Sequence, residues 1–154
     1  MSVNMDTINA VSKKKKPRIS PTLYMTDTLE YTLFIIKPDG MPHRGDIIRN
    51  VRRHGFKSLI SKRFQLSPEQ AAELYQEYEH RKTYMLMVLN MSNGPVEVML
   101  LTREDAIDQL VGLMALYGDY QDDLKNAVHG SLDLDAAKRE IRYFFPNCKY
   151  VRCL

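Results

Sequence analysis

The chain has 154 residues, of which 44% are hydrophobic and 27% charged, the size and composition of one globular domain. Its longest apolar stretch, residues 84–89, is too short to cross a bilayer, and no long apolar leader opens the chain. Cys148 and Cys153 form neither a disulfide framework nor a zinc-binding pattern. These features exclude the membrane-spanning and disulfide-rich classes, and we expect a cytoplasmic protein.

The net charge of +3 is concentrated at the N-terminus. Residues 1–20 hold five Lys or Arg against one Asp, a balance of +4, which leaves −1 for the remainder. Residues 1–28 lack a repeating apolar pattern and contain two prolines, so we predict a basic flexible tail. Its Lys and Arg run at 13–18 could bind an acidic protein surface, nucleic acid or an import receptor, or serve only as a solvated arm. The predicted domain spans 29–147, followed by a C-terminal tail at 148–154.

The first predicted strand ends at a lysine. Residues 31–36 are mostly aromatic or β-branched and run into the turn Lys37-Pro38-Asp39-Gly40. We expect the ammonium of Lys37 to be free to swing there, either towards a phosphate oxygen or as a plain surface charge. Apolar residues at helical spacing then predict a helix over 44–54, ended by Gly55, and residues 56–66 predict a second strand.

The middle of the chain carries the clearest helix start. Ser67-Pro68-Glu69-Gln70 is a capping box with proline at the first helical position. The helix that follows carries Tyr75, which either is a half-buried aromatic or turns its hydroxyl into a cleft. A short helix over 84–91 and a turn at 93–95 complete this region.

The last part of the domain is predicted to alternate between strands and helices. A third strand covers 96–101, the polar residues 102–105 cap a helix that continues through Met114, and a polar link over 117–123 leads to a strand at His129. Asp133 or Asp135 opens a final helix, which Pro146 ends. The order β-α-β-α-β-α-β-α predicts an α+β fold, a ferredoxin-like sandwich with a four-stranded antiparallel sheet.

The chemistry-bearing stretch is Lys125-Asn126-Ala127-Val128-His129-Gly130-Ser131. Glycine directly after a histidine removes side-chain bulk beside the imidazole, and the serine supplies a short-range hydroxyl. His129 is therefore a candidate nucleophile. Alternatively, it is a histidine with satisfied hydrogen bonds at a strand end, and Ser131 is an ordinary helix cap.

With this stretch, the motif starting at Lys37, and Ser92-Asn93-Gly94-Pro95 before a strand, the chain resembles the nucleoside diphosphate kinases over about residues 31–145. The resemblance implies the ferredoxin-like fold and transfer of a phosphoryl group between nucleotides through a phosphohistidine. It also implies that Mg²⁺ enters with ATP or a nucleoside diphosphate. It suggests no set of metal-ligating side chains.

The resemblance also implies a role for six residues of this chain. They are His129 as nucleophile, Glu140 as the carboxylate that orients the ring, Lys37 as the phosphate-binding lysine, Tyr75 as the tyrosine near the histidine, Asn126 as the sugar contact, and Ser131 as the neighbouring serine.

The departures from the family pattern concern the nucleotide clamp. The residue expected to stack on the base is Thr83, and Tyr117 stands where a second arginine is expected, in an interval shorter than the family loop. Two lost charge-assisted phosphate contacts would cost about 3 to 6 kcal/mol. The shortened loop also argues against the hexamer that the family forms.

Two hypotheses follow. In the first, favoured slightly, the domain is a weak or degenerate kinase that binds nucleotide weakly. It would serve as a structural or nucleotide-sensing module of a ciliary or axonemal assembly, with its basic tail contacting protein partners. We expect a location in the cilium or flagellum because the chain resembles a divergent branch of the family whose members are found there. In the second, the chain is a working nucleoside diphosphate kinase. Nucleic-acid binding is a distant third, because the body shows no basic face with interleaved aromatics.

Overall fold

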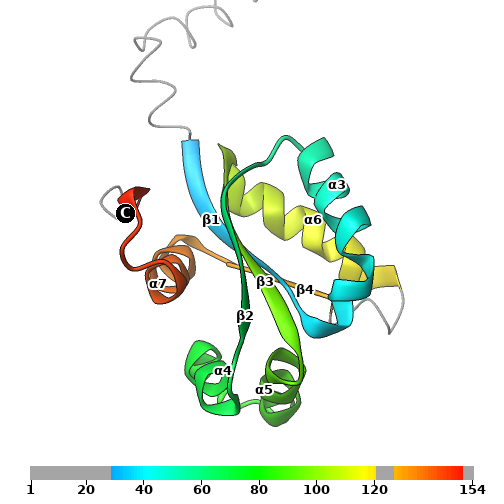
Figure 1. Ribbon diagram of the computed structural model, residues 1–154, viewed down its shortest axis with the longest axis vertical. Helices are drawn as coiled ribbons and strands as arrows, with labels where there is room; N and C mark the ends of the chain where they lie inside the picture. The colour runs from blue at the N-terminus through cyan, green and yellow to red at the C-terminus, as the bar shows by residue number, and fades with distance from the viewer. Residues whose placement is uncertain (1–28, 121–126, 151–154) are drawn as a thin grey trace, which may run out of the picture.

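The computed structural model describes residues 29–120 and 127–150, with the backbone alone over 116–120. Strands and helices alternate along this part of the chain (Figure 1). The strands are β1 (Leu29–Ile36), β2 (Lys57–Gln65), β3 (Pro95–Glu104) and β4 (Val128–Gly130); the α-helices are α3 (Arg44–Arg53), α4 (Pro68–Leu74), α5 (Tyr84–Ser92), α6 (Ala106–Tyr120) and α7 (Leu134–Phe144); the 3-10 helices are η1 (Pro38–His43) and η2 (Gln76–Tyr78). The predicted basic tail lies outside the described residues, as does the end of the C-terminal tail from residue 151.

The strands form one antiparallel sheet in the order β2-β3-β1-β4. The long strands β1 and β3 are central, and the three-residue β4 pairs with the C-terminal half of β1. The predicted ferredoxin-like α+β sandwich with a four-stranded antiparallel sheet is confirmed.

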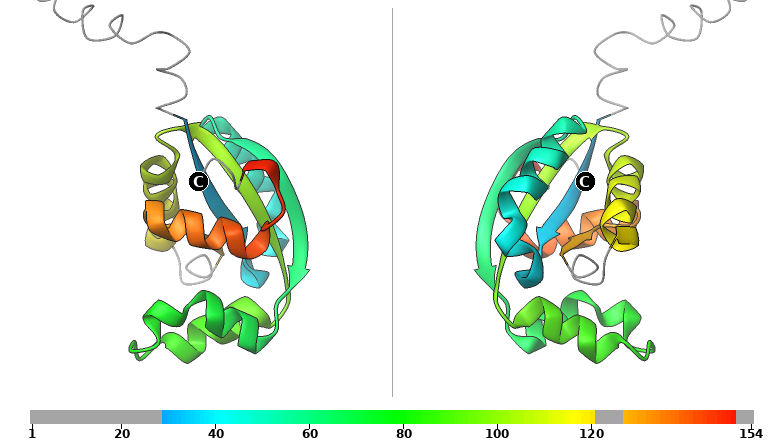
Figure 2. Two further views of the ribbon diagram at one scale, coloured as in Figure 1. Left: turned by 90° about the vertical axis from the view of Figure 1, so that its left-hand side faces the viewer. Right: turned by 90° about the vertical axis from the view of Figure 1, so that its right-hand side faces the viewer.

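Helices cover both faces of the sheet. Alternation along β1 sends Leu33 and Ile35 to one face and Phe34 and Ile36 to the other, and all four are fully buried. The first pair packs in a core with residues of α4, α5 and α7, and the second with residues of α3 and α6. Figure 2 shows α7 in front of the sheet on one side, and α3 and α6 on the opposite side.

The boundary between β3 and α6 differs from the prediction. Residues 102–104 do not cap a helix but extend the strand, because β1 begins at Leu29 and pairs with residues up to Glu104. The hydroxyl of Thr102 donates to the backbone oxygen of Glu30, which ties the two strand ends together. Asp105, with φ of 55°, makes the turn.

Helix α6 is also longer than predicted. The residues expected to begin a polar link at 117 continue the helix to Tyr120. The part of the helix that was predicted packs against the strand that carries His129: a Cβ added at Gly130 would clash with Met114 and meet the buried Leu110.

The structure shows which residues cap the N-termini of α4 and α7, the two helices whose starts were predicted from capping residues. The capping box at α4 is confirmed: Ser67 Oγ accepts from the Gln70 amide at 3.1 Å, and the Ser67 amide donates to the Gln70 side chain at 2.9 Å. At α7 the cap is Asp133, not Asp135, since Asp133 Oδ1 accepts from the Ala136 amide at 2.8 Å. In the described part of the chain, no helix has the length and apolar character needed to cross a membrane.

Candidate functional site

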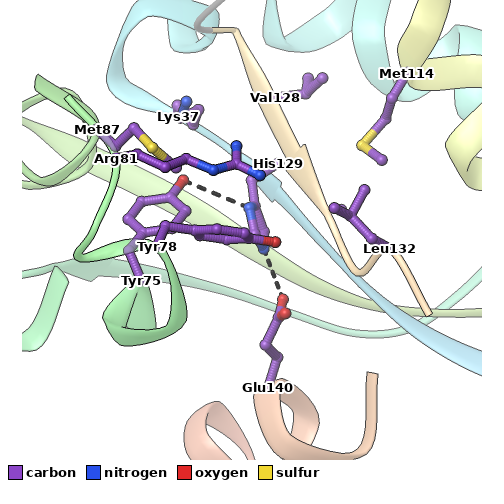
Figure 3. Close-up of a pocket in the computed structure, with 11 residues that line it drawn as sticks. Lys37, Tyr75, Tyr78, Arg81, Met87, Met114, Val128, His129, Leu132 and Glu140 are labelled. Carbon is purple, nitrogen blue, oxygen red and sulfur yellow. Dashed lines mark hydrogen bonds and ion pairs between the residues drawn. The ribbon is translucent and has the colours of Figure 1, made fainter. Parts of the chain in front are cut away.

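His129 lies at the middle of β4, opposite Ile35 of β1. Its ring has a different partner on each nitrogen. Nε2 lies 2.6 Å from Glu140 Oε1, and Nδ1 lies 3.5 Å from the Tyr75 hydroxyl. Figure 3 shows the imidazole between these two side chains, which come from α7 and from the end of α4.

Glu140 also has a second side-chain partner. The carboxylate is buried and accepts a second hydrogen bond from Ser131 Oγ at 3.2 Å to the same oxygen. Ser131 is itself fully buried. Because Glu140 has two donors, its position on α7 is defined before any ligand arrives.

This arrangement decides the tautomer of the ring. An ionised carboxylate only accepts hydrogen bonds, so the short bond to Glu140 requires the proton of His129 on Nε2. Nδ1 then carries a lone pair. A neutral imidazole with a free Nδ1 is a competent nucleophile.

Tyr75 packs edge-on against the imidazole, with ring centroids 5.5 Å apart and an interplanar angle of 79°. The sequence left two options for Tyr75, a half-buried aromatic or a hydroxyl turned into a cleft, and the structure combines them. The ring is buried in the core, and its hydroxyl reaches the histidine. Burial raises the pKa of the Tyr75 phenol, with the nearby Glu140 adding to the shift. The hydroxyl therefore stays protonated and can donate a hydrogen bond.

Lys37 is not the freely swinging side chain expected from the sequence. It is 7% exposed, and burial lowers the pKa of its ammonium, an effect partly offset by Asp39. The backbone here is closely packed: the Lys37 amide donates to the Ala127 oxygen at 2.8 Å, and a Cβ at Gly40 would clash with that same backbone. Ala127, the residue before β4, thus packs against the turn that follows β1.

These side chains border a cavity of about 220 Å³. In Figure 3 the lining side chains come from β4, from η2 and the turn after it, and from α6, among other elements. Its lining residues are Lys37, Tyr75, Tyr78, Arg81, Met87, Met114, Val128, His129, Gly130, Leu132 and Glu140. A nucleophile, an ammonium and a guanidinium therefore share one opening, which suits a phosphate-bearing ligand.

The family model for nucleoside diphosphate kinase matches residues 30–150. The chain belongs to the nucleoside diphosphate kinase family. It is 37% identical to the human protein named nucleoside diphosphate kinase homolog 5, over 82% of this chain and 65% of that protein. A nucleoside diphosphate kinase of Histophilus somni is 33% identical, over 77% of this chain and 94% of the relative.

The solved structures agree on the fold. The nucleoside diphosphate kinase of Halobacterium salinarum in complex with CDP superposes with a TM-score of 0.69 at 34% identity, over 77% of this chain and 88% of that one. The chain spans about two thirds of the length of the human relative.

Four of the residues predicted from the family resemblance meet in the cavity: His129, Glu140, Tyr75 and Lys37. Ser131 lies behind them, bonded to Glu140. Thr83 is exposed at the start of α5 and is not among the lining residues. Its Oγ1 lies 3.9 Å from the sulfur of Met87, and Met87 does line the cavity.

Two other predicted positions lie outside what the structure describes. Asn126 falls in the undescribed segment, and Tyr117 lies in the part of α6 known only by its backbone. Their assignments remain predictions.

The sequence analysis missed Arg81 and Tyr78, both of which line the cavity. The available signal was spacing: Tyr78 and Arg81 follow Tyr75 at intervals of three, which places successive side chains on one side of a 3-10 turn. Among the described residues, no three His, Cys, Asp or Glu side chains cluster as metal ligands.

Proposed function

We propose that His129 takes the terminal phosphoryl group of a nucleoside triphosphate on Nδ1 and returns it to a nucleoside diphosphate, slowly and with little choice of base. One observation carries the proposal. Glu140 binds Nε2 at 2.6 Å, which leaves Nδ1 as the reactive nitrogen in a cavity that Lys37 and Arg81 also line.

The transfer occurs in two steps. The Nδ1 lone pair attacks the terminal phosphorus in line, the P–N bond forms as the bond to the bridging oxygen breaks, and the diphosphate leaves with that electron pair. The ring is then cationic, with its Nε2–H donating to Glu140. In the second step a terminal oxygen of another diphosphate attacks, and neutral His129 is regenerated.

Lys37 and Arg81 supply the positive charge for the phosphates. Lys37 is fixed by burial at the end of β1, and its ammonium would bind an oxygen of the transferred group. The hydroxyl of Tyr75 lies near Nδ1 and would donate a hydrogen bond there.

Magnesium would enter as part of the substrate, bound to ATP or to a diphosphate. The cavity suits this route, because its carboxylate, Glu140, is committed to His129 and Ser131, so phosphate oxygens are the ligands left for the ion. Mg²⁺ supplies charge neutralisation on those oxygens when bound.

We expect a weak enzyme because the clamp is small. Arg81 is the one guanidinium among the described lining residues, and no lining residue offers an aromatic face at the place of Thr83. The protein would then act mainly as a structural or nucleotide-sensing module.

The test is incubation of the purified full chain with γ-labelled ATP and magnesium, followed by measurement of acid-labile label. We expect slow labelling that is absent from His129→Ala. Label that persists in this variant would show that another residue is the acceptor.

A fully active nucleoside diphosphate kinase is the second candidate. Retention of Arg81 in the cavity favours it, since this guanidinium could replace part of the expected clamp. Steady-state transfer from ATP to a second diphosphate separates the two: a turnover rate well below 1 s⁻¹, the low end of the usual enzyme range of about 1 to 10³ s⁻¹, supports the module.

We further propose that the protein serves in a ciliary or axonemal assembly and that residues 1–20 anchor it there to an acidic protein surface. The support is the family branch that the sequence resembles and the concentration of positive charge at 13–18. Deletion of residues 1–20 should abolish incorporation into the assembly and leave His129 labelling unchanged. Normal incorporation of the truncated chain would contradict the anchor role.

A further inference from the structure

The guanidinium of Arg81 rests on an aromatic ring inside the candidate site. Its central carbon lies 4.5 Å from the centroid of the Tyr78 ring, and both side chains line the cavity of His129. The Arg81 amide also donates to the Tyr78 backbone oxygen at 2.9 Å, so one turn of chain joins the two residues. Building on the proposed function, we propose that Tyr78 is a positioning residue that holds the Arg81 guanidinium over the cavity to receive a phosphate group.

Tyr78 is itself held by the core of the site. Its ring centroid lies 6.2 Å from that of the buried Tyr75, and Tyr75 in turn packs edge-on against His129 at 5.5 Å. Figure 3 shows the side chains of Arg81, Tyr78 and Tyr75 grouped around the imidazole of His129. The rigid part of the site thus extends outward through Tyr78 to an otherwise exposed side chain.

Arg81 gains from being held. An exposed arginine samples many rotamers, and a ligand that must order it loses affinity. A guanidinium already stacked on a ring loses less freedom on binding. The cavity is also lined by Lys37, which is buried just after the C-terminal end of β1. Arg81 is therefore the cation that can meet the outer phosphates of a ligand.

Tyr78 does not serve instead as the missing platform for the nucleotide base. One face of its ring carries the Arg81 guanidinium, and on another side it packs against Tyr75. A base that stacked on the face under Arg81 would have to displace the guanidinium. The ring of Tyr78 therefore acts through Arg81, and its effect is on phosphate binding whatever the base.

The experiment measures binding of two probes by calorimetry to the full chain: magnesium–ATP, and tripolyphosphate, which has no base. Tyr78→Leu should weaken both about two- to fivefold, the factor that corresponds to an exposed cation–π contact. Tyr78→Phe keeps the ring and should bind like the wild type. In an Arg81→Ala background, Tyr78→Leu should have no further effect.

Two additional measurements distinguish positioning from a general structural loss. The magnesium–ATP concentration that half-saturates His129 labelling should rise in Tyr78→Leu by the same factor as the loss of binding, and Tyr78→Phe should restore the wild-type value. Tyr150→Leu is the matched control: Lys149 Nζ lies 5.2 Å from the Tyr150 ring, so the variant removes a similar pair outside the cavity and should bind both probes normally.

Several results would overturn the proposal. They are equal losses from Tyr78→Leu with and without Arg81, a loss in Tyr78→Phe as large as in Tyr78→Leu, and failure of the wild type to bind tripolyphosphate. Binding of both probes without labelling of His129 would contradict the proposed phosphoryl transfer alone, and the binding cycle would still decide the role of Tyr78.

Discussion

At the scale of single residues, the bond between Glu140 and His129 would determine which ring nitrogen accepts the phosphoryl group in the proposed transfer. Glu140→Gln keeps an oxygen that can accept from Nε2 but removes the charge that stabilises the ring once it is phosphorylated. A charge-assisted hydrogen bond contributes about 1.5 to 3 kcal/mol, so we expect His129 labelling to slow by roughly 10- to 100-fold. Rapid quench of the labelling reaction measures this.

The matched control is Ser131→Ala, which removes only the second donor to the same carboxylate oxygen. This bond also has the carboxylate as acceptor but is longer, 3.2 Å against 2.6 Å, so labelling should slow less than in Glu140→Gln. Equal rates for wild type and Glu140→Gln would show that the carboxylate does not assist the transfer.

The lowered pKa of Lys37 predicts a specific pH dependence of stability. Between that lowered pKa and the ordinary value of 10.5, the unfolded chain keeps the proton and the folded chain has released it. The free energy of unfolding therefore increases with pH across this window. Lys37→Met removes the buried charge, so it should be more stable than wild type at neutral pH, and this advantage should shrink as the pH approaches 10.5.

Urea midpoints at several pH values measure the effect. The exposed Lys62, replaced by Met, is the control and should show no such trend. A difference between Lys37→Met and wild type that stays constant with pH would contradict the prediction.

Thr83→Phe should restore a stacking surface. Since Thr83 already reaches the side chain of Met87 on the cavity wall, a phenyl ring there can extend along that wall. Base stacking contributes about 1 to 3 kcal/mol, so ADP should bind roughly 5- to 100-fold more tightly. Tripolyphosphate has no base and should bind unchanged. Equal gains for both ligands would argue against stacking.

The sequence predicted which residues meet at the candidate site but not how they are surrounded. The resemblance to the family implied that Glu140 and Tyr75 lie beside His129, and the structure brings the three side chains together. The burial of Lys37 was not predictable, because the turn that carries it packs against residues distant in sequence, such as Ala127, whose backbone oxygen accepts from the Lys37 amide. Local patterns carry no information about such coverage.

At the scale of elements, the cap of α7 fixes the helix that carries Glu140. Asp133→Ala should lower the free energy of unfolding by about 1 kcal/mol, the usual loss for an N-cap. Denaturant titration measures it. Asp135→Ala is the comparison, since Asp135 is exposed in the first turn and is not the residue that caps the helix, so its loss should be smaller. Equal losses would show that charge near the helix end, and not the cap, is responsible.

Element boundaries were predicted best where a side chain marks them. Ser67 and Gln70 form a reciprocal pair that can be recognised in the sequence, and α4 begins there. The end of β3 has no such mark, because pairing with the first residues of β1 extends it to Glu104. Long-range pairing thus overrode the helix-capping character of residues 102–105.

At the scale of the whole molecule, the alternation of strands and helices was enough to predict the sandwich. An antiparallel sheet with helices on both faces leaves few connections, so errors of a few residues at the ends of elements did not change the topology. Assembly is a separate matter, because it depends on surfaces.

We expect the protein not to form the hexamer of its family, since α6 continues as helix to Tyr120 through the interval where the family has a long loop that builds subunit contacts. Static light scattering at low micromolar concentration should report a monomer or a dimer. A mass of six chains would contradict the prediction.

The rings around His129 also determine what the protein emits in ultraviolet light. The chain has nine tyrosines and no tryptophan, so its intrinsic fluorescence is that of tyrosine. Two of these fluorophores lie near the imidazole of His129: Tyr75 packs against it, and Tyr78 packs against Tyr75. A change of charge on that imidazole alters the field at the nearer phenol. The protein therefore carries its own optical reporter at the site, and no label has to be introduced to follow it.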